Sequence, residues 1–366
     1  MDKGSTRFRA NALSKTAGSG PVMKSGGKGR QVFLAALTIS ISTVGTLVVL
    51  EVVARAVARQ PAYLYLPSDN PRLIYELNPQ HPEINSFGMR QEEIDRSTLQ
   101  DHFVIAVIGD SHAYSANSAR RENSFPARLE HHLTALSGRR IKVLNLGVPG
   151  YNMAQELEVL KHKALPFRPD LIVLQYCIND EHISSYIQPE HVLLNHALHK
   201  SVLISRVWQK LLYSTFGQRH LLSFVEDHAP DLLLFSPGLV GTPRARELDP
   251  AHAPHPPRSR EQVPPRYHDL VGWDNLKRDV AIFGEIARNA NVPALATGFI
   301  ENRNRDLYDA SGFDVYSFFE IFDGLDMREF GYDPANTATH FSDGGSDFIG
   351  NALAQHINAN FRLAKR

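Results

Sequence analysis

The sequence of 366 residues contains a single cysteine, Cys177, which excludes an internal disulfide bond and any metal site built from several thiolates. Net charge is also absent, because 39 Lys and Arg residues balance 39 Asp and Glu residues, so bulk charge does not favour nucleic acid as a partner. A glycine-rich phosphate loop is missing, as is a basic patch interleaved with aromatic residues. His252 and His255 stand in a proline-rich stretch without thiols, which does not indicate zinc. The sequence therefore predicts no metal, no other cofactor and no nucleic-acid partner.

One long stretch lacks charge altogether. Val32–Leu50 holds 19 consecutive uncharged residues. As a helix they would extend about 28 Å, close to the hydrocarbon thickness of a bilayer. We interpret residues 31–54 as an uncleaved transmembrane helix rather than a buried core helix. A cleaved signal peptide is the alternative, since Ala54-Arg55-Ala56 resembles a cleavage site, but the apolar part of a signal peptide usually has only about 7–15 residues.

The residues before this helix are basic. Residues 1–30 contain seven Lys or Arg residues against one acid, Asp2, and have no apolar period, which is typical of a flexible tail. By the positive-inside rule, this tail lies in the cytoplasm. We therefore expect a single-pass protein of the cytoplasmic (inner) membrane, with the rest of the chain outside it.

A connector with several prolines follows at residues 55–100. Tyr63, Tyr65, Ile74 and Tyr75 lie within it, and these large apolar side chains favour burial. We predict a stiff neck that packs on the following domain rather than a free linker.

Residues 101–366 alternate strand-like apolar runs with amphipathic helical patterns. Strands are expected at 103–108, 141–146, 171–176, 292–299 and, as a short fifth, 313–318. Helices are expected at 124–133, 153–164, 276–287 and from a cap at Ser342 or Asp343 to about 361. This alternation predicts an α/β domain of three layers, in which helices cover both faces of a doubly wound, mainly five-stranded parallel sheet.

An insertion at about 181–270 interrupts this pattern. Its apolar segment at 202–224 predicts helices. Thr242–Arg266 holds seven prolines, which predicts a mobile loop. Because the insertion follows the third strand, it would lie beside the carboxyl edge of the sheet. A lid, a substrate-binding subdomain and an unrelated surface excursion all stay open.

Polar groups follow three of the predicted strands. The run FVIAVI ends in Gly109-Asp110-Ser111, and the next two strands lead to a turn at Gly147–Gly150 and to Asn179. Open α/β sheets bind ligands at the carboxyl ends of their strands. A nucleophilic serine needs a base and also hydrogen-bond donors for the oxyanion, which a glycine N–H and an asparagine amide can supply. The base must come from a later loop at the same edge.

Four segments in this order resemble the conserved blocks of the SGNH (GDSL) hydrolase family: Gly109-Asp110-Ser111, Gly150, Asn179-Asp180 and His340 before the last helix. The resemblance covers about residues 84–361, and it includes the segments NSFGMR and SFPARLE that are found in membrane-anchored bacterial members. It implies a flavodoxin-like fold and hydrolysis of esters through an acyl group carried on Ser111. It also implies an oxyanion hole formed by the N–H groups of Ser111 and Gly150 with the side chain of Asn179, and His340 as the base.

The sequence departs from the family pattern in two places. Cys177 stands where the third block usually has glycine, and we expect a buried structural residue there. Thr337 stands three residues before His340, where the family has an aspartate. Asp333 is the candidate for that acid through a longer loop; otherwise a hydroxyl or a backbone carbonyl orients the imidazole of a Ser–His dyad. We expect Asp110 to hold the turn rather than to act as the acid.

These features together predict a membrane-anchored serine esterase that hydrolyses O-acyl esters. The expected substrate, an acylated carbohydrate outside the membrane, follows from location and family habit rather than from any residue. Two alternatives stay open: an O-acyltransferase that uses the same residues, and a non-catalytic glycan-binding or assembly protein on this scaffold.

Overall fold

The N-terminal unit of the computed structural model is one long helix, α1 (Gly26–Val57), which continues further in both directions than the predicted 31–54. Its segment Gly29–Ala56 has a mean hydropathy of 2.2 and is long and apolar enough to cross a membrane. This apolar helix near the N-terminus fits a signal sequence or a membrane anchor. The structure describes residues 26–57, 64–183, 201–212, 214–221, 224–225, 260, 263, 265–336 and 339–363. Most of the predicted basic tail and most of the predicted loop 242–266 lie outside these residues.

A parallel sheet of five strands organises the second unit, Ala58–Arg366, in the order β4-β3-β5-β6-β7. Its strands are β3 (Phe103–Gly109), β4 (Ile141–Asn145), β5 (Leu171–Tyr176), β6 (Ala294–Gly298) and β7 (Asp314–Val315). The predicted doubly wound sheet is therefore confirmed, although its last strand is shorter than expected. The order along the sheet reverses next to β3, and this reversal opens the crevice in which such sheets bind ligands.

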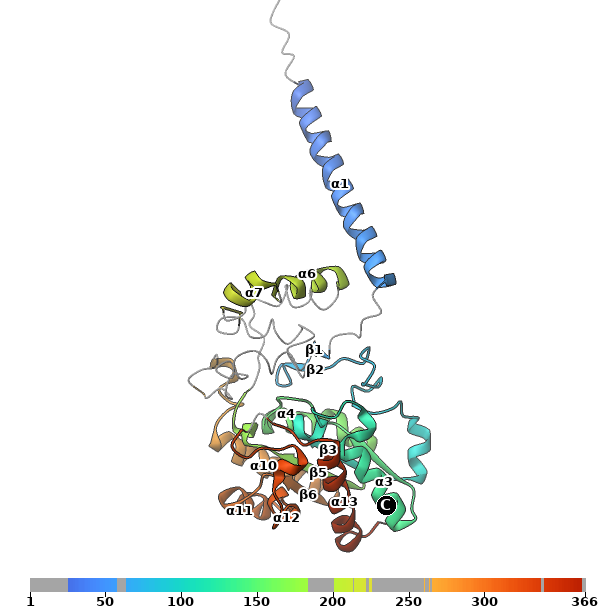
Figure 1. The fold of residues 1–366 in the computed structure, drawn as a ribbon, viewed down its shortest axis with the longest axis vertical. Coiled ribbons are helices and arrows are strands. Elements are labelled where there is room, and N and C mark those ends of the chain that lie inside the picture. The colour runs from blue at the N-terminus through green and yellow to red at the C-terminus, as the bar shows by residue number, and fades with distance from the viewer. Residues whose placement is uncertain are drawn as a thin grey trace, which may run out of the picture. The chain divides into compact units, whose positions relative to one another are not determined.

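Helices cover both faces of this sheet because every residue of β3 is buried and alternate residues point to opposite sides. Val104, Ala106 and Ile108 pack in one core with helices α4 (Met153–Val159) and α10 (Trp273–Asn289). Phe103, Ile105 and Val107 pack in a second core with α3 (Phe125–Ser137) and α13 (Asp343–Asn360), which lie against each other (Figure 1).

The ends of the main helices follow their sequence signals. Ser124 caps α3 by accepting the N–H of Ala127, as expected from the serine and proline at its start. Ser342 rather than Asp343 caps α13, because the Ser342 hydroxyl accepts the N–H of Gly345. The predicted helix 153–164 is α-helical only through Val159. It continues as a π-helical turn, η3 (Leu160–Ala164), and a 3₁₀ turn, η4 (Leu165–Phe167).

Short elements connect these helices and strands. They are α2 (Ser111–Tyr114), α11 (Asn302–Ala310), α12 (Phe318–Ile321), η1 (Arg96–Asp101), η2 (Arg121–Asn123), η5 (Ile178–Glu181), η10 (Pro265–Tyr267) and η11 (Met327–Phe330). Within the insertion the structure describes α6 (Val202–Leu212) and α7 (Thr215–His220), where the apolar segment predicts helices.

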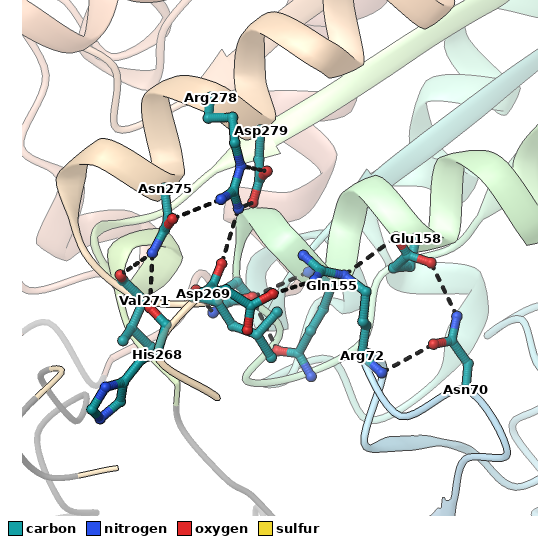
Figure 2. A network of polar contacts seen from close by, with 12 residues as sticks. Asn70, Arg72, Gln155, Glu158, His268, Asp269, Val271, Asn275, Arg278 and Asp279 are labelled. Atoms are coloured by element: carbon teal, nitrogen blue, oxygen red, sulfur yellow. Dashed lines mark hydrogen bonds and ion pairs between the residues drawn. The ribbon is translucent and has the colours of Figure 1, made fainter. Parts of the chain in front are cut away.

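The connector before the sheet is anchored to the domain. Its strands β1 (Tyr65–Pro67) and β2 (Tyr75–Leu77) pair antiparallel, and Tyr65, Ile74 and Tyr75 are buried in the first core. Polar contacts add to this packing, because Arg72 lies between Glu158 of α4, at 3.5 Å, and Asp269, at 2.5 Å (Figure 2). Tyr63 lies outside the described residues.

Candidate active site

Ser111 begins the short helix α2 directly after β3. The carboxylate of Asp110 caps this helix, because its Oδ1 accepts the N–H of His112 at 2.9 Å. From the neighbouring strand β5, Gln175 Oε1 accepts the N–H of Ala113 at 2.9 Å. Ser111 is half-buried whereas the next three residues are fully buried. The hydroxyl of Ser111 therefore lies on a turn that hydrogen bonds to Asp110 and Gln175 hold in place.

His340 reaches this serine from a position 229 residues further along the chain. Its Nε2 lies 2.7 Å from Ser111 Oγ. Two hydrogen bonds fix the backbone at and after His340: Asn117 Nδ2 donates to the His340 carbonyl at 2.6 Å, and the Ser342 N–H donates to the Phe330 carbonyl at 2.8 Å. A neutral imidazole with its proton on Nδ1 presents its Nε2 lone pair to the Ser111 hydroxyl and can accept that proton.

A hydrogen bond joins the two segments that carry the proposed oxyanion donors after β4 and β5. Asn179 Nδ2 donates to the carbonyl of Tyr151 at 3.0 Å, so the amide packs against the residue that follows Gly150. Gly150 adopts φ +79°, a left-handed conformation that glycine adopts without strain. Gly147 lies so close to α2 that a Cβ there would collide with the backbone of Ala113 and Tyr114.

Asp333, the candidate acid, lies in the turn before His340. Its Oδ1 accepts the N–H of Ala335 at 3.0 Å, and its own N–H donates to Thr339 Oγ1 at 2.7 Å. Thr337, which stands where the family has its aspartate, lies outside the described residues. The role of Asp333 as partner of the imidazole therefore stays a prediction.

Asp110 is the carboxylate nearest to the nucleophile in sequence and in space. It is 1% exposed, and its Oδ2 lies 3.3 Å from Ser111 Oγ. Burial raises the pKa of this carboxyl, while the His112 N–H and the charge of His340 act in the opposite direction. As expected from the sequence, the carboxylate makes the hydrogen bond that holds the turn carrying Ser111.

Cys177 directly follows β5 and is buried, with 5% of its surface exposed. Burial, with the carboxylates of Asp110 and Asp180, raises the pKa of this thiol well above its ordinary value. Because the thiolate is the reactive form of cysteine, Cys177 is chemically inert in this environment.

His112 is buried against His340, a contact that the sequence does not predict. Its ring lies 4.6 Å from the ring of His340, with 33° between the planes. Phe299, Tyr332 and Phe341 surround it at centroid distances of 5.1, 5.7 and 5.8 Å. Burial lowers the pKa of His112 to about 3, so the ring is neutral at physiological pH. Among the 17 histidines of the sequence, only its position next to Ser111 indicates that His112 belongs to the site.

Two further carboxyl groups are buried near Asp110: Glu156 in α4 and Asp180 in η5. Glu156 is 0% exposed and Asp180 is 1% exposed, and their four carboxyl oxygens have no hydrogen-bond partner within the described part of the chain. Burial raises the pKa of both groups well above the ordinary value, and each also responds to the nearby Asp110. Among the described residues, no group of three His, Cys, Asp or Glu side chains is arranged to hold a metal ion.

These features coincide with a known family. A model of the GDSL-like lipase/acylhydrolase family matches residues 107–347, a segment that contains Ser111, Gly150, Asn179 and His340. The chain belongs to this family. The GDSL-like acylhydrolases are esterases, so the protein is an enzyme that acts on ester bonds. No curated protein matches the chain.

Several solved structures are similar in fold. An esterase from Pseudoalteromonas sp. has 10% identity and a TM-score of 0.37, over 70% of this chain and 97% of that one. An acetylxylan esterase from Geobacillus stearothermophilus has 13% identity and a TM-score of 0.37, over 72% and 96% of the two chains. At these values the likeness says nothing about the substrate of this GDSL-like enzyme.

Proposed function

We propose that this protein is a serine esterase that removes O-acyl groups through an acyl-enzyme on Ser111. The observation that carries the proposal is the 2.7 Å contact between Ser111 Oγ and His340 Nε2. As Oγ attacks the ester carbonyl, Nε2 takes the hydroxyl proton and the carbonyl oxygen becomes an oxyanion. The intermediate then collapses, and the departing alcohol receives that proton from His340. A water molecule, activated by the same imidazole, attacks the acyl group and releases the acid.

Three donors are available for the oxyanion in this proposal. They are the backbone N–H groups of Ser111 and Gly150 and the side-chain amide of Asn179. Asn179 uses one N–H for the Tyr151 carbonyl and retains a second for the substrate. Donors fixed in advance by the fold stabilise developing charge without reorganisation, which is usually a large part of enzymatic rate enhancement.

The imidazole needs a partner that holds its Nδ1 proton in place. Asp333 is our candidate for this acid, since it lies in the turn that leads to His340. Its Oδ1 already holds the Ala335 N–H at 3.0 Å, which leaves Oδ2 for the imidazole. A Ser–His dyad oriented by a hydroxyl or a backbone carbonyl is the alternative.

For the location, we propose that α1 is an uncleaved anchor in the bacterial inner membrane, with its N-terminus in the cytoplasm and the catalytic domain outside. The apolar segment Gly29–Ala56 and the basic residues before it support this orientation. An acylated carbohydrate of the cell envelope or of an exported polymer is the substrate that such an enzyme would meet.

The test uses the full chain in detergent micelles, with an aryl acetate and an acetylated glycan as substrates. We expect Ser111→Ala to abolish acetate release and labelling by a fluorophosphonate probe. Ser137→Ala is the control, because Ser137 ends α3, which runs back from the edge where Ser111 lies. Failure of the wild-type protein to label would favour a non-catalytic binding protein. Ester formation on a glycan acceptor that exceeds hydrolysis would favour an acyltransferase.

A further inference from the structure

The turn that carries Gly150 runs from Val148 to Tyr151. The Tyr151 N–H donates to the Val148 carbonyl at 3.1 Å, which closes a β-turn of four residues. Pro149 is its second residue, and Gly150, with φ +79°, is its third. Proline followed by glycine in this left-handed conformation is typical of a type II turn. The Pro149–Gly150 peptide is therefore the central peptide of the turn.

The orientation of this central peptide decides where the Gly150 N–H points. Type I and type II turns differ by a flip of their central peptide, and after such a flip the N–H would point the other way. Hydrogen bonds hold both ends of the turn. The Val148 N–H donates to the Gly109 carbonyl at 3.0 Å, and Asn179 Nδ2 donates to the Tyr151 carbonyl at 3.0 Å. Neither bond involves the central peptide.

Tyr75, the first residue of β2, contacts the central peptide directly. Its hydroxyl donates to the Pro149 carbonyl at 2.9 Å. A trans peptide is planar, with its C=O and N–H on opposite sides. A donor that holds the Pro149 carbonyl therefore also fixes the direction of the Gly150 N–H. The same hydrogen bond polarises the peptide, which makes its N–H a stronger donor.

Tyr75 is itself fixed and stays protonated. It is 1% exposed, and burial, together with the nearby Asp110, raises the pKa of its hydroxyl well above the ordinary value. The ring centroids of Tyr75 and Tyr151 lie 5.2 Å apart. The Tyr151 hydroxyl also donates to the Tyr75 carbonyl. The residue after Gly150 thus holds the backbone of the tyrosine that holds the Pro149 carbonyl.

The backbone directly before Tyr75 has an unfavourable conformation. Ile74 adopts φ +67°, which is rare for a residue with a β-branched side chain. Its surroundings hold it there, because its N–H donates to the Asn70 carbonyl at 3.2 Å and its carbonyl accepts the Ser68 N–H at 2.9 Å. Backbone strain of this kind persists only where the surrounding structure over-determines it, and it clusters at functional sites. The conformation of Ile74 therefore fits a connector that places Tyr75 at a functional site.

We propose that Tyr75 is a positioning residue for ester hydrolysis, which fixes the Pro149–Gly150 peptide so that its N–H points at the oxyanion. This inference rests on the proposed function, because it takes Gly150 as an oxyanion donor. It gives the connector between α1 and the sheet a part in catalysis in addition to its packing on the domain.

The variant Tyr75→Phe tests the proposal in the full chain in detergent micelles, because it keeps the ring and removes only the hydroxyl. Loss of a whole oxyanion donor costs about 10²- to 10³-fold in kcat, and here the donor remains but is no longer fixed, so we expect about tenfold lower kcat on an aryl acetate. KM should stay within about twofold of wild type, since the oxyanion forms only after the substrate has bound. A kcat within about twofold of wild type in the folded variant contradicts the proposal.

The pH profile of kcat separates positioning of a donor from a general distortion of the site. Its acid limb reports the apparent pKa of the base in the enzyme–substrate complex. The hydroxyl of Tyr75 acts on the oxyanion donor and not on His340, so Tyr75→Phe should lower kcat by the same factor at every pH. A shifted midpoint of the acid limb would indicate a distorted base and would contradict the proposal.

Tyr65→Phe is the matched control. Tyr65 is a second buried tyrosine of the connector, and its ring centroid lies 5.3 Å from that of Tyr75. We expect wild-type kcat in this variant, and a loss equal to that of Tyr75→Phe overturns the proposal. If Tyr75→Phe does not fold, Tyr151→Phe removes the hydroxyl that holds the Tyr75 carbonyl. It should lower kcat by a smaller factor, and wild-type kcat in it contradicts the proposal.

Ser111→Ala distinguishes failure of this inference from failure of the proposed function. Turnover that depends on Ser111 but not on Tyr75 overturns the positioning role and leaves the esterase mechanism standing. Turnover that does not depend on Ser111, or no turnover by the wild-type protein, overturns the proposed function and this inference with it.

Discussion

The ring centroids of His112 and His340 lie 4.6 Å apart, and the two imidazoles differ in their expected protonation. In the proposed mechanism His340 accepts a proton from Ser111, whereas aromatic neighbours enclose His112 and burial lowers the pKa of His112 to about 3. A neutral ring behind the base adds packing without adding a second positive charge. The imidazolium that would form on His340 in the proposed mechanism therefore has an uncharged neighbour.

This arrangement predicts a loss of stability in acid. The unfolded His112 takes up a proton near pH 6.5, while the folded residue stays neutral down to about pH 3. The free energy of unfolding should therefore fall as the pH decreases through this window, by on the order of 3 kcal/mol from this group between pH 7 and pH 4.5. We expect His112→Phe, which keeps an aromatic ring, to show a flatter pH dependence in urea denaturation. His131→Phe on the exposed face of α3 is the control, and an unchanged slope in His112→Phe would contradict the interpretation.

The sheet, and the place of Ser111 at the carboxyl end of β3, could be predicted from the sequence because their signals are local. Each strand is a short apolar run, and polar residues follow directly where a strand ends, as in Gly109-Asp110-Ser111. Parallel strands bring such ends to one edge, which is why Ser111, the Gly147–Gly150 turn and Asn179 were placed together. His340 was identified by its position before the last helix and by the family resemblance rather than by its residue type.

The remaining features depend on contacts that no local pattern encodes. The aromatic enclosure of His112 comes from Phe299, directly after β6, and from Tyr332 and Phe341, all far along the chain. Glu156 has the pattern of a polar helix position, but α10 packs over α4 and contributes to its burial.

The buried carboxyl of Glu156 predicts a stabilising substitution. Burial raises the pKa of this group, so the folded protein keeps it protonated at a pH where the unfolded chain has released the proton. The free energy of unfolding therefore falls as the pH rises from about 4.5 toward the folded pKa. We expect Glu156→Gln to raise the melting temperature at pH 8 and to change it much less at pH 4.5.

Glu158, two residues further along α4, is the control, because its pKa is shifted in the opposite direction. Burial raises the pKa of its carboxyl, but the hydrogen bonds from Lys161 and Asn70 outweigh this effect, and the pKa is lowered. Figure 2 shows the contact between Asn70 and Glu158. The charged form of Glu158 therefore stabilises the fold above about pH 4.5. Glu158→Gln should lower the melting temperature at pH 8. The same sign of change in both variants would contradict the assignment of a neutral Glu156.

The proposed oxyanion donor Asn179 can be tested separately from the nucleophile. Asn179→Ala removes an amide donor, and loss of one such donor typically lowers kcat by about 10²- to 10³-fold. Asn179→Asp places a carboxylate oxygen where the oxyanion would form, so we expect a still lower kcat with little change in KM. Steady-state kinetics on an aryl acetate measure both, with Asn360→Ala at the end of α13 as the control. Retention of wild-type kcat in Asn179→Ala would remove this residue from the proposed site.

The acid partner of His340 is tested by a substitution that preserves the turn. Asparagine at position 333 can still accept the Ala335 N–H through its carbonyl oxygen, but it cannot supply a negative charge to the imidazole. If the proposed triad holds, Asp333→Asn should lower kcat by at least about 10²-fold, because the imidazole loses the group that fixes its tautomer and stabilises its charged form. Asp333→Ala removes the turn contact as well and shows how much of the loss is structural. A kcat within about twofold of wild type in Asp333→Asn would make the site a Ser–His dyad, with the turn as the only role of Asp333.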